Sequence, residues 1–130
     1  RRLLTHVRDV MRTGERIPMV KPSESLSTAI LEITRKGLGM TAVVDPNHKL
    51  LGVFTDGDLR RLIEQGQDLR GLMVADVMKG NPKTIHPDRM AVEAVNLMET
   101  SHISQVVVTE KDHTVVGALN FHDLFEAKVV

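Results

Sequence analysis

Hydrophobic and polar positions follow two alternating patterns along the chain. Short apolar runs bounded by Gly, Pro or Asp predict strands, and apolar positions spaced three and four residues apart predict helices. The first half contains both patterns. It predicts a short strand at 17–20, a helix between Ser25 and Gly37, strands at 41–44 and 50–54, and a helix from Thr55 to about Gly66. The predicted order is therefore β-α-β-β-α.

The second half repeats this order. The stretch 74–79 resembles 7–12, which overlaps a short amphipathic helical segment predicted over 3–11. The elements that follow are a strand at 84–85, a helix with an apolar stripe at Ala91, Ala94, Val95 and Met98, strands at 105–109 and 114–119, and a helix from Asn120 to about Lys128. Regular internal repetition indicates two copies of one structural unit.

The most closely repeated part is the corner at which the last strand of each copy runs into its last helix. The matched residues are Gly52 and Gly117, Thr55 and Asn120, Asp58 and Asp123, and Leu59 and Leu124. Each pair is separated by 65 positions in the numbering. The two copies therefore match most closely at this corner.

The repeat predicts the fold class. A unit of about 60 residues is marginally stable alone, because it buries too little apolar surface. Two such units packed together share a larger core. We therefore expect an α+β fold in which two β-α-β-β-α repeats pack as a pseudo-twofold pair. The first repeat, with its leading helix, is predicted at 1–73, and the second at 74–130.

Composition narrows the classes of function. The formal net charge is zero, and the aromatic residues are three Phe with no Trp or Tyr, which argues against a nucleic-acid partner. No cysteine is present, so disulfides and thiolate chemistry are excluded. No apolar run approaches the roughly 20 residues of a membrane-spanning helix, so we expect no membrane partner. The chain begins Arg1-Arg2 without Met, and we interpret it as a piece of a longer cytoplasmic protein.

Thr55 and Asp58 are the first candidates for binding chemistry. At the start of a helix, a Thr followed three positions later by a carboxylate forms a capping box, which stabilises the helix by about 1 kcal/mol. The same arrangement can bind a ligand. Helix N-termini attract phosphate, and a carboxylate accepts hydrogen bonds from a ribose diol. Spacing alone leaves both interpretations open.

The sequence offers no catalytic or metal site. No Ser or Thr has a recognisable base and orienting group, so we expect no catalytic residue. Asp56-Gly-Asp58 suggests a metal loop, but Arg60 and Gln67 stand where a calcium loop needs an oxygen ligand and its closing Glu. We therefore expect no metal and no cofactor.

The repeated motifs resemble a known family. Each copy opens with Val-x-Asp-Val-Met, and the first closes with Gly-Val-Phe-Thr-x-x-Asp-Leu, a pattern similar to tandem cystathionine-β-synthase (CBS) domains, or Bateman modules. Three stretches, 1–4, 34–40 and 54–61, are also similar to the C-terminal half of bacterial D-arabinose 5-phosphate isomerases. In that family a catalytic sugar-isomerase (SIS) domain precedes the CBS pair. The resemblance therefore implies that these 130 residues carry no isomerase activity.

The resemblance also implies two ligand clefts, each lined by both copies. The first would be lined by Thr55, Asp58, Thr84, Ile85, His102, Ser104 and Gln105. The second would be lined by Pro18, Met19, Leu38, Gly39, Met40, Asn120 and Asp123. We expect the second cleft to be the weaker, because Asn120 departs from the family's Thr and the residues facing it are mostly apolar. Arg60 and Arg61 could clamp an anion or lie on a solvated helix face.

Two functions from different classes follow. The chain is expected to be a regulatory module that binds a nucleotide or nucleotide-sugar and regulates an attached sugar-phosphate isomerase in Kdo and lipopolysaccharide biosynthesis. The resemblance suggests CMP-Kdo as the ligand, with adenine nucleotides as the generic alternative of CBS domains. The alternative is a structural module that only dimerises its enzyme and whose clefts are vestigial. Apolar stripes on equivalent helices predict a homodimer or a larger homo-oligomer in either case.

Overall fold

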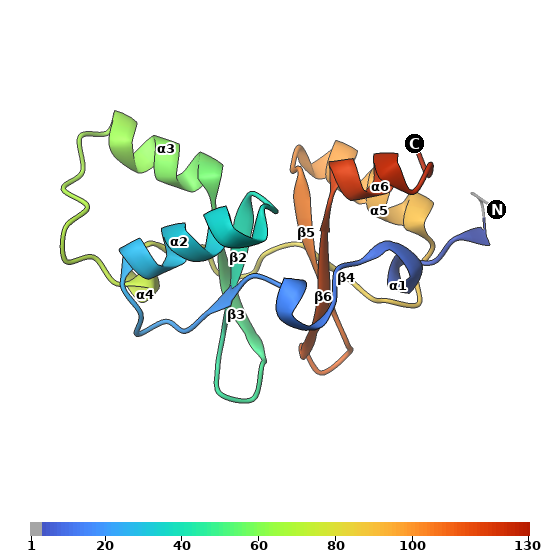
Figure 1. The fold of residues 1–130 in the computed structure, drawn as a ribbon, viewed down its shortest axis with the longest axis horizontal. Helices are drawn as coiled ribbons and strands as arrows, with labels where there is room; N and C mark the ends of the chain where they lie inside the picture. Colours follow the sequence, from blue (N-terminus) through green and yellow to red (C-terminus); the bar gives the residue numbers. More distant parts are fainter. Residues whose placement is uncertain (1–3) are drawn as a thin grey trace. The chain divides into compact units, whose positions relative to one another are not determined.

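The computed structural model describes residues 4–130, and the predicted order of elements is confirmed in both halves of the chain (Figure 1). The chain forms two compact units. We call Pro18–Pro82 the central unit. The composite unit joins the N-terminal segment, through Ile17, to Lys83–Val130. The predicted start of the first helical segment, at residue 3, lies outside the described residues.

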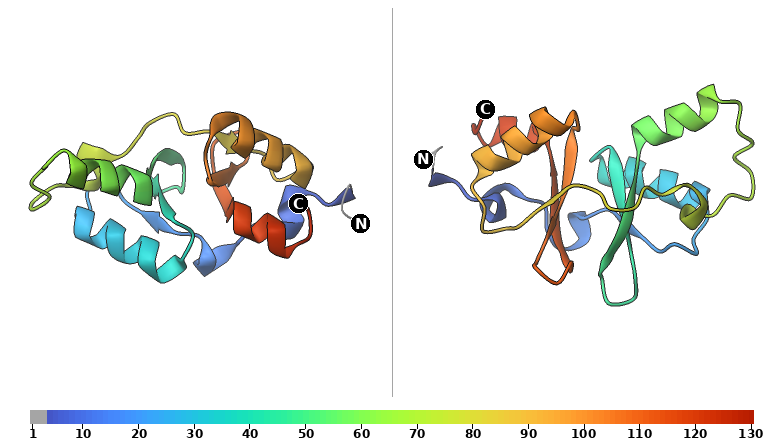
Figure 2. Two further views of the ribbon diagram at one scale, coloured as in Figure 1. Left: turned by 90° about the horizontal axis from the view of Figure 1, so that it is seen from above. Right: turned by 180° about the vertical axis from the view of Figure 1, so that it is seen from behind.

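The central unit is a three-stranded sheet with helices on one face (Figures 1 and 2). Its elements are β1 (Met19–Val20), α2 (Leu26–Lys36), β2 (Met40–Val44), β3 (Leu50–Thr55), α3 (Asp56–Glu64) and the short α4 (Val74–Val77). The strand order is β1-β2-β3, with β1 parallel and β3 antiparallel to β2. The five-residue connection between β2 and β3 makes the antiparallel hairpin that the sequence predicts.

The core of the central unit follows the predicted apolar stripe. Leu26, Ala29 and Ile33 of α2 are buried against Val43 and Phe54 of the sheet. Ser25 begins α2 by accepting a hydrogen bond from the N–H group of Thr28. Gly37 ends the helix in the left-handed conformation, with φ of 69°, which glycine adopts without steric cost.

The composite unit repeats this arrangement. Its elements are α1 (Val7–Val10), β4 (Thr84–Ile85), α5 (Ala91–Ser101), β5 (Gln105–Thr109), β6 (Val115–Asn120) and α6 (Phe121–Glu126). The strand order is β4-β5-β6, with β4 parallel and β6 antiparallel to β5. Both α5 and α6 lie on one face of this sheet (Figures 1 and 2). The predicted stripe of α5 is confirmed, because Ala91, Ala94 and Met98 are buried in the core and Val95 packs against it.

Each compact unit takes its leading segment from the opposite sequence repeat. The N–H group of Val7, in α1, donates to the carbonyl of Arg89 (2.8 Å), and Arg8 donates to Pro87 (3.0 Å). In the central unit Val74, in α4, donates to Glu24 (2.8 Å). These hydrogen bonds hold the segment before the first repeat on the second sheet, and the segment before the second repeat on the first sheet. The compact units are therefore not the same as the sequence repeats predicted at 1–73 and 74–130.

Two isolated bridges complete this exchange. Arg12 pairs with Ala118 of β6 in the composite unit, and Lys79 pairs with Val53 of β3 in the central unit. The segments pass so close to the sheet that no side chain fits beneath them. A Cβ atom at Gly52 would lie 2.6 Å from the carbonyl oxygen of Lys79. At Gly117 it would lie 2.5 Å from the sulfur of the flexible Met11 side chain and 3.0 Å from the carbonyl oxygen of Arg12. The crossing therefore restricts both glycines, and it does so most strictly at Gly52.

Several helix boundaries differ from the prediction. The first helical segment, predicted to run to Met11, is limited to Val7–Val10. The helix predicted to reach Gly66 ends at Glu64, and the one predicted to reach Lys128 ends at Glu126. The last residues of these helices contribute no buried apolar position, so the periodic pattern does not fix where each helix ends, and boundaries shift by one or two residues. None of the helices among residues 4–130 is long and apolar enough to cross a membrane.

Candidate functional site

The corner between β3 and α3 positions Thr55 and Asp58. Thr55 ends the strand in an extended conformation and caps the helix. Its Oγ1 accepts a hydrogen bond from the N–H group of Asp58 (3.1 Å), and Asp58 Oδ2 accepts one from the N–H group of Thr55 (3.0 Å). The capping box is therefore confirmed, and it fixes the Asp58 carboxylate at the start of the helix.

The same corner recurs between β6 and α6. Asn120 Oδ1 accepts a hydrogen bond from the N–H group of Asp123 (2.9 Å), and Asp123 Oδ2 accepts one from the N–H group of Asn120 (3.0 Å). The departure from Thr to Asn thus preserves the cap, because an amide oxygen accepts the same bond. What distinguishes the two corners is the set of charged groups around each carboxylate.

Asp58 is buried but lies beside two cations. It is 6% exposed. Its Oδ1 atom lies 2.6 Å from Arg61 Nη2 and 3.2 Å from Lys79 Nζ, and these two side chains are 54% and 62% exposed. Burial raises the pKa of the Asp58 carboxyl, but hydrogen bonds from Arg61, Thr55 and Lys79 outweigh burial and hold the pKa below its usual value. The carboxylate therefore remains charged and able to accept hydrogen bonds at neutral pH.

Asp123 is held by one arginine. Arg12 Nε lies 3.3 Å from Oδ1 and 3.1 Å from Oδ2, and Arg12 Nη2 lies 3.0 Å from Oδ1. The two side chains are only 13% and 14% exposed. A guanidinium group that contacts both oxygens of a carboxylate is the strongest arrangement of this ion pair.

Some of the backbone N–H groups at the two helix starts, which could bind an anion, already donate hydrogen bonds within the protein. The N–H group of Asp56 donates to the carbonyl of Gly39 (3.0 Å), and that of Asp58 donates to Thr55. In α6 the N–H group of Phe121 donates to the carbonyl of Ser104 (3.0 Å). Two of the first three N–H groups of α3 are therefore already bonded, and the positive charge at this corner comes mainly from the Arg61 and Lys79 side chains.

Within each unit the predicted site residues gather around the corner. Met40 pairs with Thr55 in the central unit, next to Gly39. In the composite unit Gln105 pairs with Asn120, next to Ser104. The predicted combination of Thr55 and Asp58 with residues of the second repeat stays a prediction.

The remaining predicted residues have varied settings. Ile85 is buried in the core of the composite unit beside the half-buried Thr84. His102 ends α5 with φ of 56° and is exposed. In the central unit Pro18 and Leu38 are buried, and Met19 is half-buried.

Sequence reasoning did not single out Arg12 and Lys79. Both follow the repeated Val-x-Asp-Val-Met motif, at equivalent positions in the two leading segments. The repetition of a basic residue there was the available signal. Its meaning depends on the exchange of leading segments, which brings each cation to a carboxylate far away in sequence.

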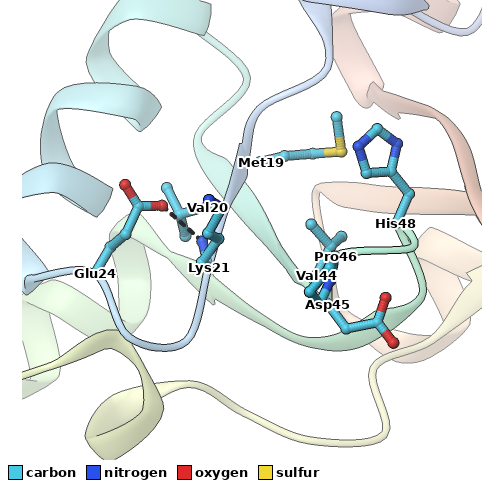
Figure 3. Close-up of a pocket in the computed structure, with 8 residues that line it drawn as sticks. All are labelled: Met19, Val20, Lys21, Glu24, Val44, Asp45, Pro46 and His48. Atoms are coloured by element: carbon cyan, nitrogen blue, oxygen red, sulfur yellow. Dashed lines mark hydrogen bonds between the residues drawn. The ribbon is translucent and has the colours of Figure 1, made fainter.

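A separate cavity of about 220 Å³ lies in the central unit, between the end of β1 and the β2–β3 turn (Figure 3). It is lined by Met19, Val20, Lys21, Glu24, Val44, Asp45, Pro46 and His48. The side chains of Met19 and His48 face one another there. Met19 is the one residue that this cavity shares with the two predicted clefts.

Backbone donors occupy both carboxylates of this cavity. Glu24 accepts from the N–H group of Lys21 (2.7 Å), and Asp45 accepts from those of Asn47 (2.8 Å) and Lys49 (2.9 Å). At the equivalent place in the composite unit, His86 Nε2 lies 3.2 Å from Glu110 Oε1. That contact joins the end of β4 to the β5–β6 turn. Among residues 4–130, no group of three or more His, Asp or Glu side chains could hold a metal ion.

Comparison with known proteins identifies the repeated unit. The sequence model of the CBS domain matches residues 7–65 and 74–130. The arabinose 5-phosphate isomerase KdsD of Escherichia coli strain K12 is 50% identical over all 130 residues. The match covers 39% of that protein. The chain therefore spans well under half the length of this curated relative.

Solved structures have the same fold. The crystal structure of CBSX2 in complex with AMP gives a TM-score of 0.84 at 26% identity and covers 96% of both chains. The CBS domain pair of protein MJ0100, in complex with 5′-methylthioadenosine and S-adenosyl-L-methionine, gives a TM-score of 0.83 at 24% identity. It covers 95% of this chain and 98% of that one. These matches confirm the predicted α+β fold of two β-α-β-β-α repeats.

Proposed function

The chain belongs to the CBS domain family, and from this premise we propose that it is a regulatory module that binds a nucleotide or a nucleotide-sugar at the Thr55–Asp58 corner. The observation that carries the proposal is the environment of Asp58. Its carboxylate is buried and charged, yet the side chains on Oδ1 are two largely exposed cations. Because both cations are largely exposed, water can hydrate each of them when a ligand hydroxyl group takes its place on the carboxylate.

The chemistry of the corner suits a ribose phosphate. Asp58 can accept hydrogen bonds from a diol, because an ionised carboxylate only accepts. Displaced from Asp58, the Arg61 guanidinium and the Lys79 ammonium lie next to the bound ribose, where they can pair with phosphate. AMP bound by the related CBSX2 supports this class of ligand. Base recognition by Thr84, Ile85, His102, Ser104 and Gln105 is part of the proposal.

The proposed parent protein is a sugar-phosphate isomerase. Half of the residues are identical to those of KdsD, an arabinose 5-phosphate isomerase, along the whole chain. An SIS domain would supply catalysis, and this chain alone is expected to show no turnover. In this setting CMP-Kdo, the activated product of the Kdo pathway, is a candidate regulatory ligand. A cytoplasmic location is part of the same proposal.

Regulation would act through a shift of populations. A ligand that prefers one arrangement of the module stabilises that arrangement by the difference in its affinities for the two. The catalytic domain responds if it also distinguishes the two arrangements, and the coupling is then reciprocal. Sugar phosphate bound by the isomerase domain would therefore change the affinity of the module for its nucleotide.

The alternative is a structural module that only dimerises its enzyme. Two observations favour it. The Asp123 carboxylate is already fully engaged by Arg12, and large apolar side chains of both units are exposed, among them Leu31, Ile63 and Phe125. We propose a homodimer or larger assembly for either function, since a symmetric partner would cover such side chains.

Titration calorimetry tests the binding function against the structural one. AMP, CMP and CMP-Kdo are titrated into the chain and into the Asp58→Ala and Asp123→Ala variants. Removing a charged acceptor for a ligand hydroxyl costs about 1.5–3 kcal/mol, so Asp58→Ala should weaken binding about ten- to hundredfold. Asp123→Ala removes the matching cap from the other corner and should change affinity far less. Melting curves without ligand separate lost binding from lost stability, and absence of binding by all three probes would leave only the structural function.

A further inference from the structure

The two corner carboxylates differ in their partners and not in their backbone. Each leading segment is fixed to its strand by two backbone hydrogen bonds. Arg12 and Ala118 exchange bonds of 2.8 and 3.3 Å, and Lys79 and Val53 exchange bonds of 2.8 and 2.9 Å. Both corners also have the same capping box. The corners differ in the cations that surround each carboxylate: Arg12 stands where the central unit has Lys79, and Arg61 is a second cation on Asp58.

We infer that Arg12 is a built-in occupant of the Asp123 carboxylate, which closes this corner to ligand hydroxyl groups and leaves the Asp58 corner open. This inference rests on the proposed function, because it explains why only one of two repeated corners takes a ligand. It makes Arg12 and Lys79 the residues that determine how many nucleotides one chain binds.

The two carboxylates also meet their cations in different ways. At Asp123 the Arg12 side chain reaches both oxygens: its Nε–H group is shared between Oδ1 and Oδ2, and a second N–H group lies on Oδ1. At Asp58 the two cations both lie on Oδ1, while Oδ2 accepts from the N–H group of Thr55. A ligand hydroxyl group can therefore replace one exposed cation at a time on Asp58, and at Asp123 it must break an ion pair that holds both oxygens.

The exposure of the two basic side chains also makes the Asp58 corner easier to open than the Asp123 corner. Lys79 is 62% exposed and contacts one oxygen of Asp58, so it can swing into solvent and be hydrated at once. Arg12 is 13% exposed and contacts both oxygens of Asp123. Moving Arg12 away would leave the partly buried Asp123 carboxylate without its cation, which is costly. The Asp123 corner is consequently closed in the folded protein.

A reciprocal exchange of the two basic residues tests the inference. Arg12→Lys gives the composite unit the side chain that the central unit has, and Lys79→Arg does the reverse. Both substitutions keep the charge, so both variants should fold. With AMP as the probe, calorimetry should give one site per chain for the unaltered protein and two for Arg12→Lys. Lys79→Arg should weaken the single site on the order of tenfold, because a guanidinium group can hold both oxygens of the carboxylate where an ammonium group holds one.

Asn120→Thr is the matched control. It restores the family residue beside Asp123 without touching Arg12, and it should leave one site per chain. One site in Arg12→Lys with unchanged affinity would overturn the inference while the proposed function stands, as would a second site in Asn120→Thr alone. No AMP binding by the unaltered protein together with one site in Arg12→Lys would support the role of Arg12 and overturn the Asp58 site. No binding by any variant would overturn both.

Discussion

Gly52 lies directly beneath the backbone of Lys79: a Cβ atom added at Gly52 would stand 2.6 Å from the Lys79 carbonyl oxygen. Real Cβ atoms do not approach a backbone oxygen so closely, and this oxygen is held by its hydrogen bond from the N–H group of Val53 (2.9 Å). The first repeat therefore tolerates no side chain at the crossing of its strand and the leading segment.

Gly52→Ala is expected to lower the free energy of unfolding by about 1–3 kcal/mol, the usual cost of forcing an extra methyl group into a packed site. Gly80→Ala serves as the control, because a Cβ atom there meets nothing within 4 Å; its effect should stay within about 0.5 kcal/mol. Urea unfolding of both variants measures the difference. Equal stabilities would show that the crossing can relax away from the sheet.

The pKa of Asp58 predicts how stability depends on pH. The folded state holds this pKa below its usual value, so the unfolded chain binds the proton more readily. The contribution of Asp58 to stability is complete above the unfolded pKa of about 3.9 and is lost as the pH falls through the lower folded value.

Unfolding curves measured between about pH 5 and pH 2 should therefore fall less steeply for Asp58→Asn than for the unaltered protein, because the amide does not titrate. At neutral pH the variant should be the less stable of the two. Parallel pH profiles for the two proteins would mean that Asp58 has the same pKa folded and unfolded.

Loss of Arg12 should cost more stability than loss of Lys79. Arg12→Ala leaves the half-buried Asp123 without its cation, for which we expect a loss of about 1–3 kcal/mol. Lys79→Ala removes an exposed cation while Arg61 still contacts Asp58, and surface pairs contribute about 0–1 kcal/mol. Thermal and urea unfolding check the order. Combining Arg12→Ala with Asp123→Asn should recover part of the loss, and no recovery would show that packing of the arginine stem matters more than its charge.

The proposed assembly can be tested without any ligand. Sedimentation at micromolar concentration should show a homodimer or a larger species, because Leu31, Ile63 and Phe125 expose large apolar side chains. Charged substitutions, Leu31→Glu and Phe125→Glu, should shift the equilibrium toward monomer if their helix faces take part. Asp68→Lys changes charge at an exposed position and serves as the control. A monomer across the whole concentration range would exclude the assembly.

Local patterns were enough to predict the elements and the corners. The stripe of Leu26, Ala29 and Ile33 and the caps at Thr55 and Asn120 depend on residues within one or two helical turns, and the structure confirms them. The fold class follows from the same repetition. These features are local, so spacing along the chain carries the information.

The charged partners were beyond the reach of the sequence. Arg12 and Asp123 lie 111 positions apart, and their contact depends on which sheet receives which leading segment. Spacing favoured neither possibility, since 7–12 and 74–79 are nearly interchangeable sequences. Hydrogen bonds such as that from Val7 to Arg89 determine which sheet each leading segment joins. The helix ends were also missed, because polar residues at a terminus carry no periodic signal.

The exchange of leading segments has a consequence for any attempt to divide the chain. A cut between residues 73 and 74 follows the sequence repeat, yet each fragment would carry away the strand partner of the other: Arg12 would leave with the first fragment and Lys79 with the second. Neither fragment could satisfy its own sheet edge at β3 or β6. We expect mixing of the two pieces to return each segment to its sheet. The two crossings thus join one repeat to the other independently of the peptide bond at the repeat boundary.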